Sequence, residues 1–123
     1  MEKLTIQEEE AMLIIWRLNG GFVKDILQAM PEQSIPYTTL ASTVKNLERK
    51  GYVTSVKYAN AWRYEPLIPE AEYKKVHMSN IVQDYFQNSY KELVNFFIED
   101  NKLSADELKE IIALIEQGKT KGL

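Results

Sequence analysis

The chain has 123 residues, 45% of them hydrophobic, and a net charge of −3 at pH 7. A chain of this length holds one compact domain with an extension, but hardly two full cores. It contains no cysteine, which excludes disulfides and thiolate metal sites, and no run approaches the roughly 20 apolar residues that span a bilayer. We therefore expect a cytoplasmic protein that needs no cofactor and no metal.

Two helices are predicted at the start of the chain. The first begins with a capping box, in which Thr5 and Glu8 bond the backbone groups of the helix start. Apolar residues then recur at helical spacing until the glycine pair at 20–21: Ala11, Ile14, Ile15 and Leu18. A second set at the same spacing ends before Pro31: Val23, Ile26, Leu27 and Met30. Both patterns are typical of short helices with one buried face.

The third predicted helix runs from Tyr37 to the basic turn before Gly51 and has two different faces. One face carries Leu40, Val44 and Leu47, whose spacing predicts a buried stripe. The other face is small, hydroxylated or cationic: Tyr37, Thr38, Ala41, Ser42, Lys45 and Arg49. Small residues allow close approach, hydroxyls bond bases and phosphates, and cations neutralise phosphate charge. This second face is therefore predicted to bind double-stranded DNA.

Residues that favour β-structure follow the third helix. Residues 53–58 and 62–65 are rich in β-branched and aromatic side chains, residues 58–61 can turn, and Pro66 ends the pattern. A two-stranded ribbon directly behind a recognition helix is typical of the wing of a winged helix-turn-helix. The aromatic residues expected in the core are Trp16, Trp62 and Tyr64. The predicted DNA-binding residues of helix and ribbon are Tyr37, Thr38, Thr39, Ala41, Ser42, Lys45, Asn46, Arg49, Lys57, Asn60 and Arg63.

Several of these residues also have a purely structural interpretation. Tyr37 either stacks on the sugar–phosphate backbone or covers the start of its helix. Ser42 and its neighbour Thr43 either contact DNA or bond back to their own helix. Charged residues on the ribbon either contact phosphates or serve solubility and protection of the sheet edge, as they do on many exposed hairpins.

Charge is segregated along the chain. Residues 36–63 carry five basic residues and one acid, a charge of +4, whereas residues 68–123 carry seven lysines and ten acids, a charge of −3. This distribution is typical of a DNA reader joined to an acidic partner-binding tail. Because one domain of this kind neutralises only a few phosphates, affinity is expected to come from two half-sites held by a dimer.

The tail is predicted to form three helices, with capping boxes at Ser89 and Ser104. Short helices with broad apolar faces cannot bury themselves alone and need either the winged domain or a second copy of the chain. We expect a homodimer, because a symmetric operator requires two-fold symmetry. The predicted dimerisation residues are Met78, Ile81, Val82, Tyr85, Phe86, Leu108, Ile111, Ile112 and Ile115. The expected fold is mainly α with a small β-ribbon: a winged helix-turn-helix DNA-binding domain in residues 1–67 and a helical dimerisation region in residues 68–123.

Three segments together resemble the penicillinase-repressor family, BlaI/MecI. They are the Ile-Ile-Trp signature at 14–16, the segment 37–51, and the aromatic return strand 62–66. The resemblance covers nearly the whole chain. It implies a cytoplasmic dimeric transcriptional repressor that binds a palindromic operator through its winged domains and dimerises through its C-terminal helices. In the antibiotic-resistance members, a membrane sensor with a metalloprotease domain leads to cleavage of the repressor within those helices.

The resemblance also implies a place for that cleavage. The family's scissile bond joins an Asn-Phe pair in the short helix before the last one, and an ungapped match places it between Phe96 and Phe97. The sequence itself has the pair Asn95-Phe96, one residue earlier. Either the cleaved bond has shifted by one residue, or this repressor is regulated without cutting.

Other classes of function receive less support from the sequence. No phosphate-binding loop, dinucleotide-binding turn, zinc-protease motif or serine nucleophile motif is present, and His77 is the only histidine, so we do not expect an enzyme. One alternative is a winged-helix module in which the third helix binds a protein. Another is a winged-helix regulator that releases DNA when a small ligand binds.

Overall fold

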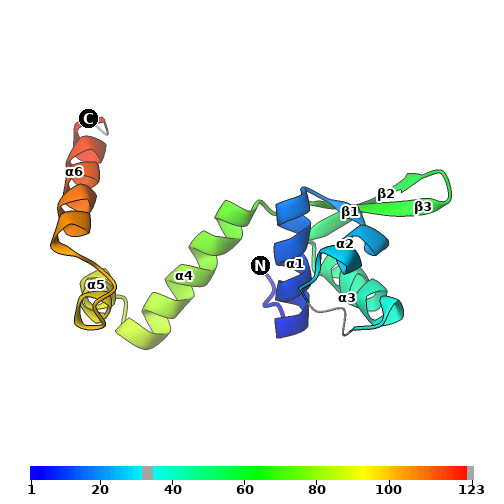
Figure 1. Cartoon of the computed structure of the whole chain (residues 1–123), viewed down its shortest axis with the longest axis horizontal. Helices are drawn as coiled ribbons and strands as arrows, with labels where there is room; N and C mark the ends of the chain where they lie inside the picture. Colours follow the sequence, from blue (N-terminus) through cyan, green and yellow to red (C-terminus); the bar gives the residue numbers. More distant parts are fainter. Residues whose placement is uncertain (32–34, 122–123) are drawn as a thin grey trace. The chain divides into compact units, whose positions relative to one another are not determined.

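The computed structural model describes residues 1–31 and 35–121, the last three of them as backbone only. The chain divides into two compact units, residues 1–74 and the residues from 75 onward. The elements in chain order are α1 (Ile6–Leu18), β1 (Gly21–Phe22), α2 (Val23–Ala29), α3 (Tyr37–Arg49), β2 (Val53–Tyr58), β3 (Ala61–Pro66), α4 (Glu70–Phe86), α5 (Tyr90–Glu99) and α6 (Ala105–Lys121) (Figure 1). The prediction of a mainly helical chain with a small β-ribbon is confirmed.

Helix α1 begins at the predicted capping box. Glu8 N donates to Thr5 Oγ1 at 3.2 Å, and Thr5 N donates to Glu8 Oε1 at 2.9 Å. The buried apolar residues of the helix are Ala11, Met12, Ile14 and Ile15. Leu18 is 39% exposed, so the prediction that it completes the buried face is wrong. The reason is that the helix ends there, where Asn19 adopts a left-handed conformation with φ 55° and turns the chain toward the sheet.

A short strand that the sequence pattern does not predict follows α1. β1 pairs antiparallel with β3, with Gly21 opposite Tyr64, so the sheet has the order β1-β3-β2. Gly20 allows this close approach, because its φ is +100° and a Cβ atom there would lie 2.8 Å from the Tyr64 carbonyl oxygen. A strand of two residues is too short to show an alternating pattern, which explains why the sequence predicts only a two-stranded ribbon.

The core of the first unit lies between helices α1, α2 and α3 and the base of the sheet. Its buried residues are Ala11, Met12, Ile14, Ile15, Val23, Ile26, Met30, Leu40, Val44, Leu47, Tyr52, Val53 and Tyr64. The three residues of the stripe predicted on α3, Leu40, Val44 and Leu47, are all 0% exposed. Burial of each such side chain stabilises the fold by about 1.5–3 kcal/mol, and burial of this stripe determines which side of α3 faces solvent.

Helix α3 ends as the sequence predicts. Gly51 has φ +83°, and Tyr52 N donates to Leu47 O at 3.0 Å, which closes the last turn. Within the helix, Thr43 is buried and its hydroxyl donates to Thr39 O at 2.9 Å. Of the two interpretations of Thr43, bonding to its own helix is therefore correct.

Strands β2 and β3 form the predicted ribbon, which extends away from the three helices with β1 beside its base (Figure 1). Tyr64 is 6% exposed and belongs to the core, as predicted. Trp62 is 50% exposed, so its prediction as a core residue is wrong. Both side chains lie on the same face of β3, but Trp62 lies nearer the tip of the ribbon, where less of the helical body covers the sheet.

The second unit buries little of its own apolar surface. Within residues 75–118, the part whose side chains are described, only Val82 is buried. Phe86 of α4 meets Phe96 of α5 edge-on, with 5.8 Å between ring centroids. Helix α6 starts at the predicted capping box, where Glu107 N donates to Ser104 Oγ at 3.1 Å. No helix in the described part of the chain is long and apolar enough to cross a bilayer.

Candidate nucleic-acid interface

The solvent-facing side of α3 carries most of the residues predicted to contact DNA. The exposed ones are Tyr37, Thr38, Ser42, Lys45 and Arg49, and the partly buried ones are Thr39, Ala41 and Asn46. Because the core stripe occupies the opposite side of the helix, the fold gathers these residues on the solvent-facing side of α3. Small and polar side chains on such a surface allow the helix backbone to approach a nucleic-acid groove closely.

The only acid of α3, Glu48, makes its hydrogen bond to the sheet and forms no ion pair with Lys45 or Arg49. Ser55 of β2 donates a hydrogen bond from its hydroxyl to Glu48 Oε2, which ties the carboxylate to the sheet. Lys45 and Arg49 form no ion pair with any residue that the structure describes. Two cations of α3 therefore remain available for phosphate groups.

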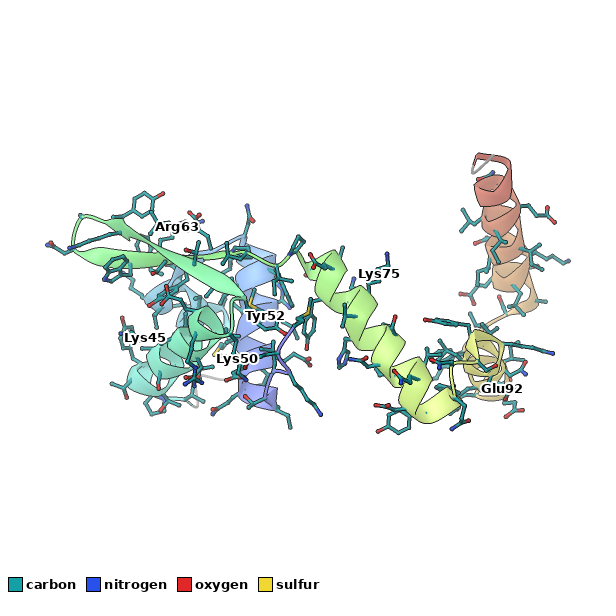
Figure 2. The ribbon with its side chains drawn as sticks, turned by 180° about the vertical axis from the view of Figure 1, so that it is seen from behind. Lys45, Lys50, Tyr52, Arg63, Lys75 and Glu92 are labelled. Atoms are coloured by element: carbon teal, nitrogen blue, oxygen red, sulfur yellow. The ribbon has the colours of Figure 1, made fainter. Side chains whose placement is uncertain are left out.

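Lys50 belongs to the interior of the first unit and not to the DNA-facing surface. Its Nζ lies 2.6 Å from Glu8 Oε1 and donates to Lys3 O at 2.9 Å. The lysine side chain is only 12% exposed and lies toward the N-terminal segment, whereas Lys45 lies nearer the start of α3 (Figure 2). The charge of +4 counted in residues 36–63 therefore overstates the charge that DNA meets, because Lys50 already has a carboxylate partner.

The buried pair of Glu8 and Lys50 also sets the protonation of Glu8. Burial opposes the charged carboxylate, but hydrogen bonds from Lys50 Nζ and from Thr5 N stabilise it and hold its pKa below the usual 4.5. A lowered pKa in the folded state means that the ionised carboxylate contributes stability above pH 4.5. That contribution is lost as the pH falls through the lower pKa of the folded state.

We expect Glu8→Gln to reduce the free energy of unfolding by about 2 kcal/mol at pH 7, because a hydrogen bond to a charged partner is lost in a buried position. The difference from the native chain should shrink as the pH falls below 4.5. Urea unfolding between pH 7 and pH 3 measures this. The exposed Glu10→Gln on the same helix is the control and should show neither effect; a constant difference at all pH values would contradict the prediction.

The predicted wing residues differ in their environments. Lys57 and Asn60 are exposed, whereas the Arg63 guanidinium already makes two contacts within the protein. Its Nη2 donates to Asn19 O at 3.1 Å, and its Nε lies 3.5 Å from Glu65 Oε1. Arg63 thus ties β3 to the end of α1, which positions the wing whether or not the guanidinium also contacts a phosphate.

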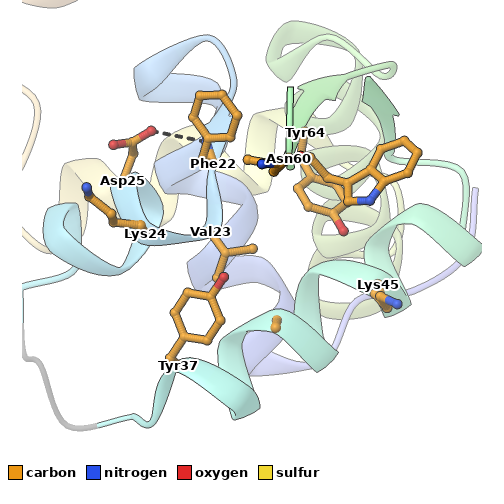
Figure 3. A pocket seen from close by; sticks show the side chains of 11 residues that line it. Phe22, Val23, Lys24, Asp25, Tyr37, Lys45, Asn60 and Tyr64 are labelled. Atoms are coloured by element: carbon orange, nitrogen blue, oxygen red, sulfur yellow. Dashed lines mark hydrogen bonds between the residues drawn. The ribbon is translucent and has the colours of Figure 1, made fainter. Parts of the chain in front are cut away.

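A hollow with a volume of about 570 Å³ lies between the wing, α3 and the start of α2. Tyr37 and Lys45 line it from α3, Tyr64 lines it from β3, and Asn60 lines it from the turn of the wing (Figure 3). The one acid in its lining, Asp25, accepts a hydrogen bond from Phe22 N at 3.2 Å. The fold therefore brings residues of the predicted helix and of the predicted wing to a single concave surface.

The first turn of α4 is anchored on the first unit. Tyr73 packs on Trp16 with 5.2 Å between ring centroids, and its hydroxyl donates to Glu9 Oε2. Trp16 in turn donates from Nε1 to Ile68 O at 2.8 Å. Burial raises the pKa of Tyr73 above its usual range, and the hydrogen bond to the Glu9 carboxylate raises it further. Trp16 is thus partly buried against the core, as predicted, and fixes the segment that leads into α4.

The residues predicted to mediate dimerisation lie in the second unit. Val82 is buried, and Ile81, Phe86 and Leu108 are partly buried. The exposed members of the set are Met78 at 40%, Tyr85 at 75%, Ile111 at 39%, Ile112 at 54% and Ile115 at 54%. The residues at the predicted cleavage position all lie within α5: Asn95 is partly buried, and Phe96 and Phe97 are exposed.

The model of one protein family, described as "Penicillinase repressor", matches residues 4–117. The chain belongs to the penicillinase repressor family. Its predicted family is thereby confirmed, and it is a DNA-binding transcriptional repressor of this family. The match includes both units of the structure, so the tail helices belong to the family pattern as well as the winged domain.

Individual relatives are distant but similar over most of their length. The penicillinase repressor of Bacillus licheniformis is 23% identical over 115 residues, which are 93% of this chain and 90% of that protein. The methicillin resistance regulatory protein MecI of Staphylococcus aureus is 24% identical over 110 residues, 89% of each chain. The solved structure of BpsR from Bordetella bronchiseptica, whose DNA binding is regulated by 6-hydroxynicotinic acid, covers 97% of this chain and 77% of its own. With a TM-score of 0.51 and 13% identity, it supports the fold alone.

In this penicillinase repressor homologue, sequence reasoning missed two residues of the candidate interface. Trp62 lines the hollow with its indole half exposed, and Lys24 lines it from the start of α2. An aromatic residue in a strand pattern predicts the core, and a lysine near a helix start predicts only solubility. The sequence does contain one signal that Trp62 is exposed. The two-residue turn fixes the register of the ribbon, and this register places Trp62 opposite the charged Lys57.

Proposed function

We propose that this repressor binds a two-fold symmetric operator as a homodimer in the cytoplasm, where the chromosome lies. Helix α3 of each protomer enters the major groove, and the wing lies on the adjacent backbone. The observation that carries the proposal is the exposed face of α3, on which Lys45 and Arg49 form no ion pair with any described residue. Thr38, Ser42 and Asn46 supply the hydroxyl and amide groups suited to base edges.

The apolar surface of the second unit supports the homodimer. Exposed large apolar side chains are normal singly, but a contiguous set marks an interface. Here large apolar side chains are exposed on each of α4, α5 and α6, among them Ile112, Leu114 and Ile115 on the last helix. A second copy of the same surface would bury this set, and its two-fold symmetry would match that of the operator.

Binding to DNA from the region upstream of the chain's own gene tests this proposal. Footprinting of the full-length protein should protect two half-sites whose centres are separated by about 10–10.5 base pairs or a multiple of it. A duplex with one half-site should bind at least about 100-fold more weakly than the symmetric duplex, because bivalency is lost. Equal affinity for the symmetric duplex and a scrambled one in moderate salt would refute the proposal, and would favour the protein-interaction alternative.

We further propose that the repressor is inactivated by cleavage within α5 by a membrane sensor protease. The family resemblance motivates this step, and the Asn95-Phe96 and Phe96-Phe97 bonds are its candidates. Both bonds lie before α6, so cutting either would separate α6 from the rest of the chain. Loss of α6 would remove part of the apolar surface that supports the dimer, and operator affinity would fall with it.

Coexpression with a sensor protease of the antibiotic-resistance type, in the presence of its inducer, should convert the repressor into a fragment ending at residue 95 or 96. Intact-mass measurement identifies the bond. Phe96→Ala should slow cutting at either bond. The control Phe86→Ala removes the aromatic neighbour of Phe96 in α4 but keeps the residues of both bonds, so it should be cut at the same bond as the native chain. Full induction with only intact repressor present would contradict cleavage.

A further inference from the structure

Trp62 is an exposed aromatic residue with an unused hydrogen-bond donor. Its side chain is 50% exposed on β3, and the Lys57 Nζ lies 5.8 Å from its ring centroid. The other tryptophan, Trp16, donates from its indole to Ile68 O, whereas no hydrogen bond from Trp62 to any described residue is present. Because the Trp62 ring is half exposed, its indole N–H is open to water or to a partner outside the chain.

The surroundings of Trp62 indicate the chemistry of that partner. It lines the hollow between wing and α3 together with Tyr37, Ala41 and Lys45. Lys24 lies at the rim from α2, and the single acid in the lining already accepts a backbone hydrogen bond. The surface therefore combines two lysines with two exposed aromatic side chains, Tyr37 and Trp62, and the small Ala41.

A sugar–phosphate unit fits this combination. Its phosphate oxygens accept hydrogen bonds and attract lysine, and its deoxyribose presents an apolar surface on which an aromatic ring packs. The position between α3 and the wing is also where one DNA strand must pass, if α3 lies in the major groove and the wing beside it.

We propose that Trp62 is a DNA-backbone contact of this repressor, with its ring on a deoxyribose and its indole N–H donating to a phosphate oxygen. Lys57 holds the ring from the neighbouring strand, and Lys45 faces the same strand of DNA from α3. This inference rests on the proposed function. It assigns to the wing an aromatic contact that binds DNA without reading its sequence.

The two tryptophans of the chain provide a direct test in the full-length protein. Both are labelled as 5-fluorotryptophan, and the fluorine resonances are assigned with Trp62→Phe. Addition of the symmetric upstream duplex should shift the Trp62 resonance and leave Trp16 unchanged. If gel shift shows the duplex bound while Trp62 does not shift, the inference is wrong and the proposed function still stands. An equal shift of both resonances would also overturn it, because it would indicate a change of the whole domain.

Affinity measurements separate a backbone contact from the alternatives. Trp62→Ala should weaken binding about 10- to 30-fold for the operator and for an unrelated duplex alike, and Trp62→Phe, which keeps a ring without the N–H, about 3- to 10-fold. The dependence of affinity on salt should be unchanged in both variants, because neither alters charge. A loss confined to the operator would indicate base readout, and unchanged affinity would indicate no contact; either result overturns the inference.

Discussion

The double variant Lys45→Glu, Arg49→Glu is expected to bind the operator about 1,000-fold more weakly than the native repressor. In a dimer the two substitutions remove four phosphate contacts, each worth about 1 kcal/mol, and place acids on the same helix face. The slope of log affinity against log salt concentration should fall by about 4, since about one counterion is released for each contact. Fluorescence anisotropy with a labelled operator at several salt concentrations measures both quantities.

The matched control for this variant has the same change of charge elsewhere. Lys91 and Lys102 are exposed in the second unit, so Lys91→Glu, Lys102→Glu alters the net charge equally without touching α3. It should keep operator affinity within about threefold, because distant charges are screened within about 10 Å at moderate salt. Equal losses in the two variants would mean that overall charge, and not the α3 surface, governs binding.

A second large effect is expected from Ile111→Glu, Ile115→Glu on α6. These residues lie one helical turn apart and are 39% and 54% exposed in the single chain. Four carboxylates in an apolar dimer contact cannot all be solvated there, so the protein should become monomeric at micromolar concentration. Affinity for the full operator should fall by about 100- to 10,000-fold, because the second half-site is no longer bound intramolecularly.

The half-site duplex provides the internal control for the α6 variant. Binding of one winged domain to one half-site does not need the dimer, so that affinity should be unchanged. Ile6→Glu is the matched substitution on the first unit, where Ile6 is 82% exposed at the start of α1, and it should affect neither assembly nor binding. Sedimentation velocity gives the assembly state. If the α6 variant is still a dimer, the prediction is wrong and the dimer contact does not involve this face of α6.

The local elements of this fold were predictable because each depends on residues close together in the chain. The spacing of Leu40, Val44 and Leu47 predicted the buried side of α3, and the capping boxes marked where α1 and α6 begin. Gly51 and Pro66 marked the limits of the wing. The buried stripe also predicts the exposed face of α3, because that face lies on the opposite side of the helix. The candidate interface was therefore largely readable from α3 alone.

Residues whose roles depend on distant partners were not predictable in this way. The sequence places Lys50 with the basic surface, but its carboxylate partner Glu8 lies 42 residues earlier in the chain. The sequence predicts Arg63 as a phosphate contact, and in the structure its guanidinium also donates to Asn19 O, 44 residues away. The residue type of Trp62 predicts burial in the core, and only the length of the wing beyond the helices shows that it is exposed.

The sequence by itself determined the family, the order of helices and wing, and the side of α3 that faces solvent, because periodicity, caps and turn residues act over a few neighbouring positions. The tertiary structure decided which cations remain available to phosphate, where β1 closes the sheet, and how Trp62 joins α3 and Lys24 around one hollow. These depend on contacts between segments far apart in the chain, and no local pattern specifies which side chains such contacts will bury or pair.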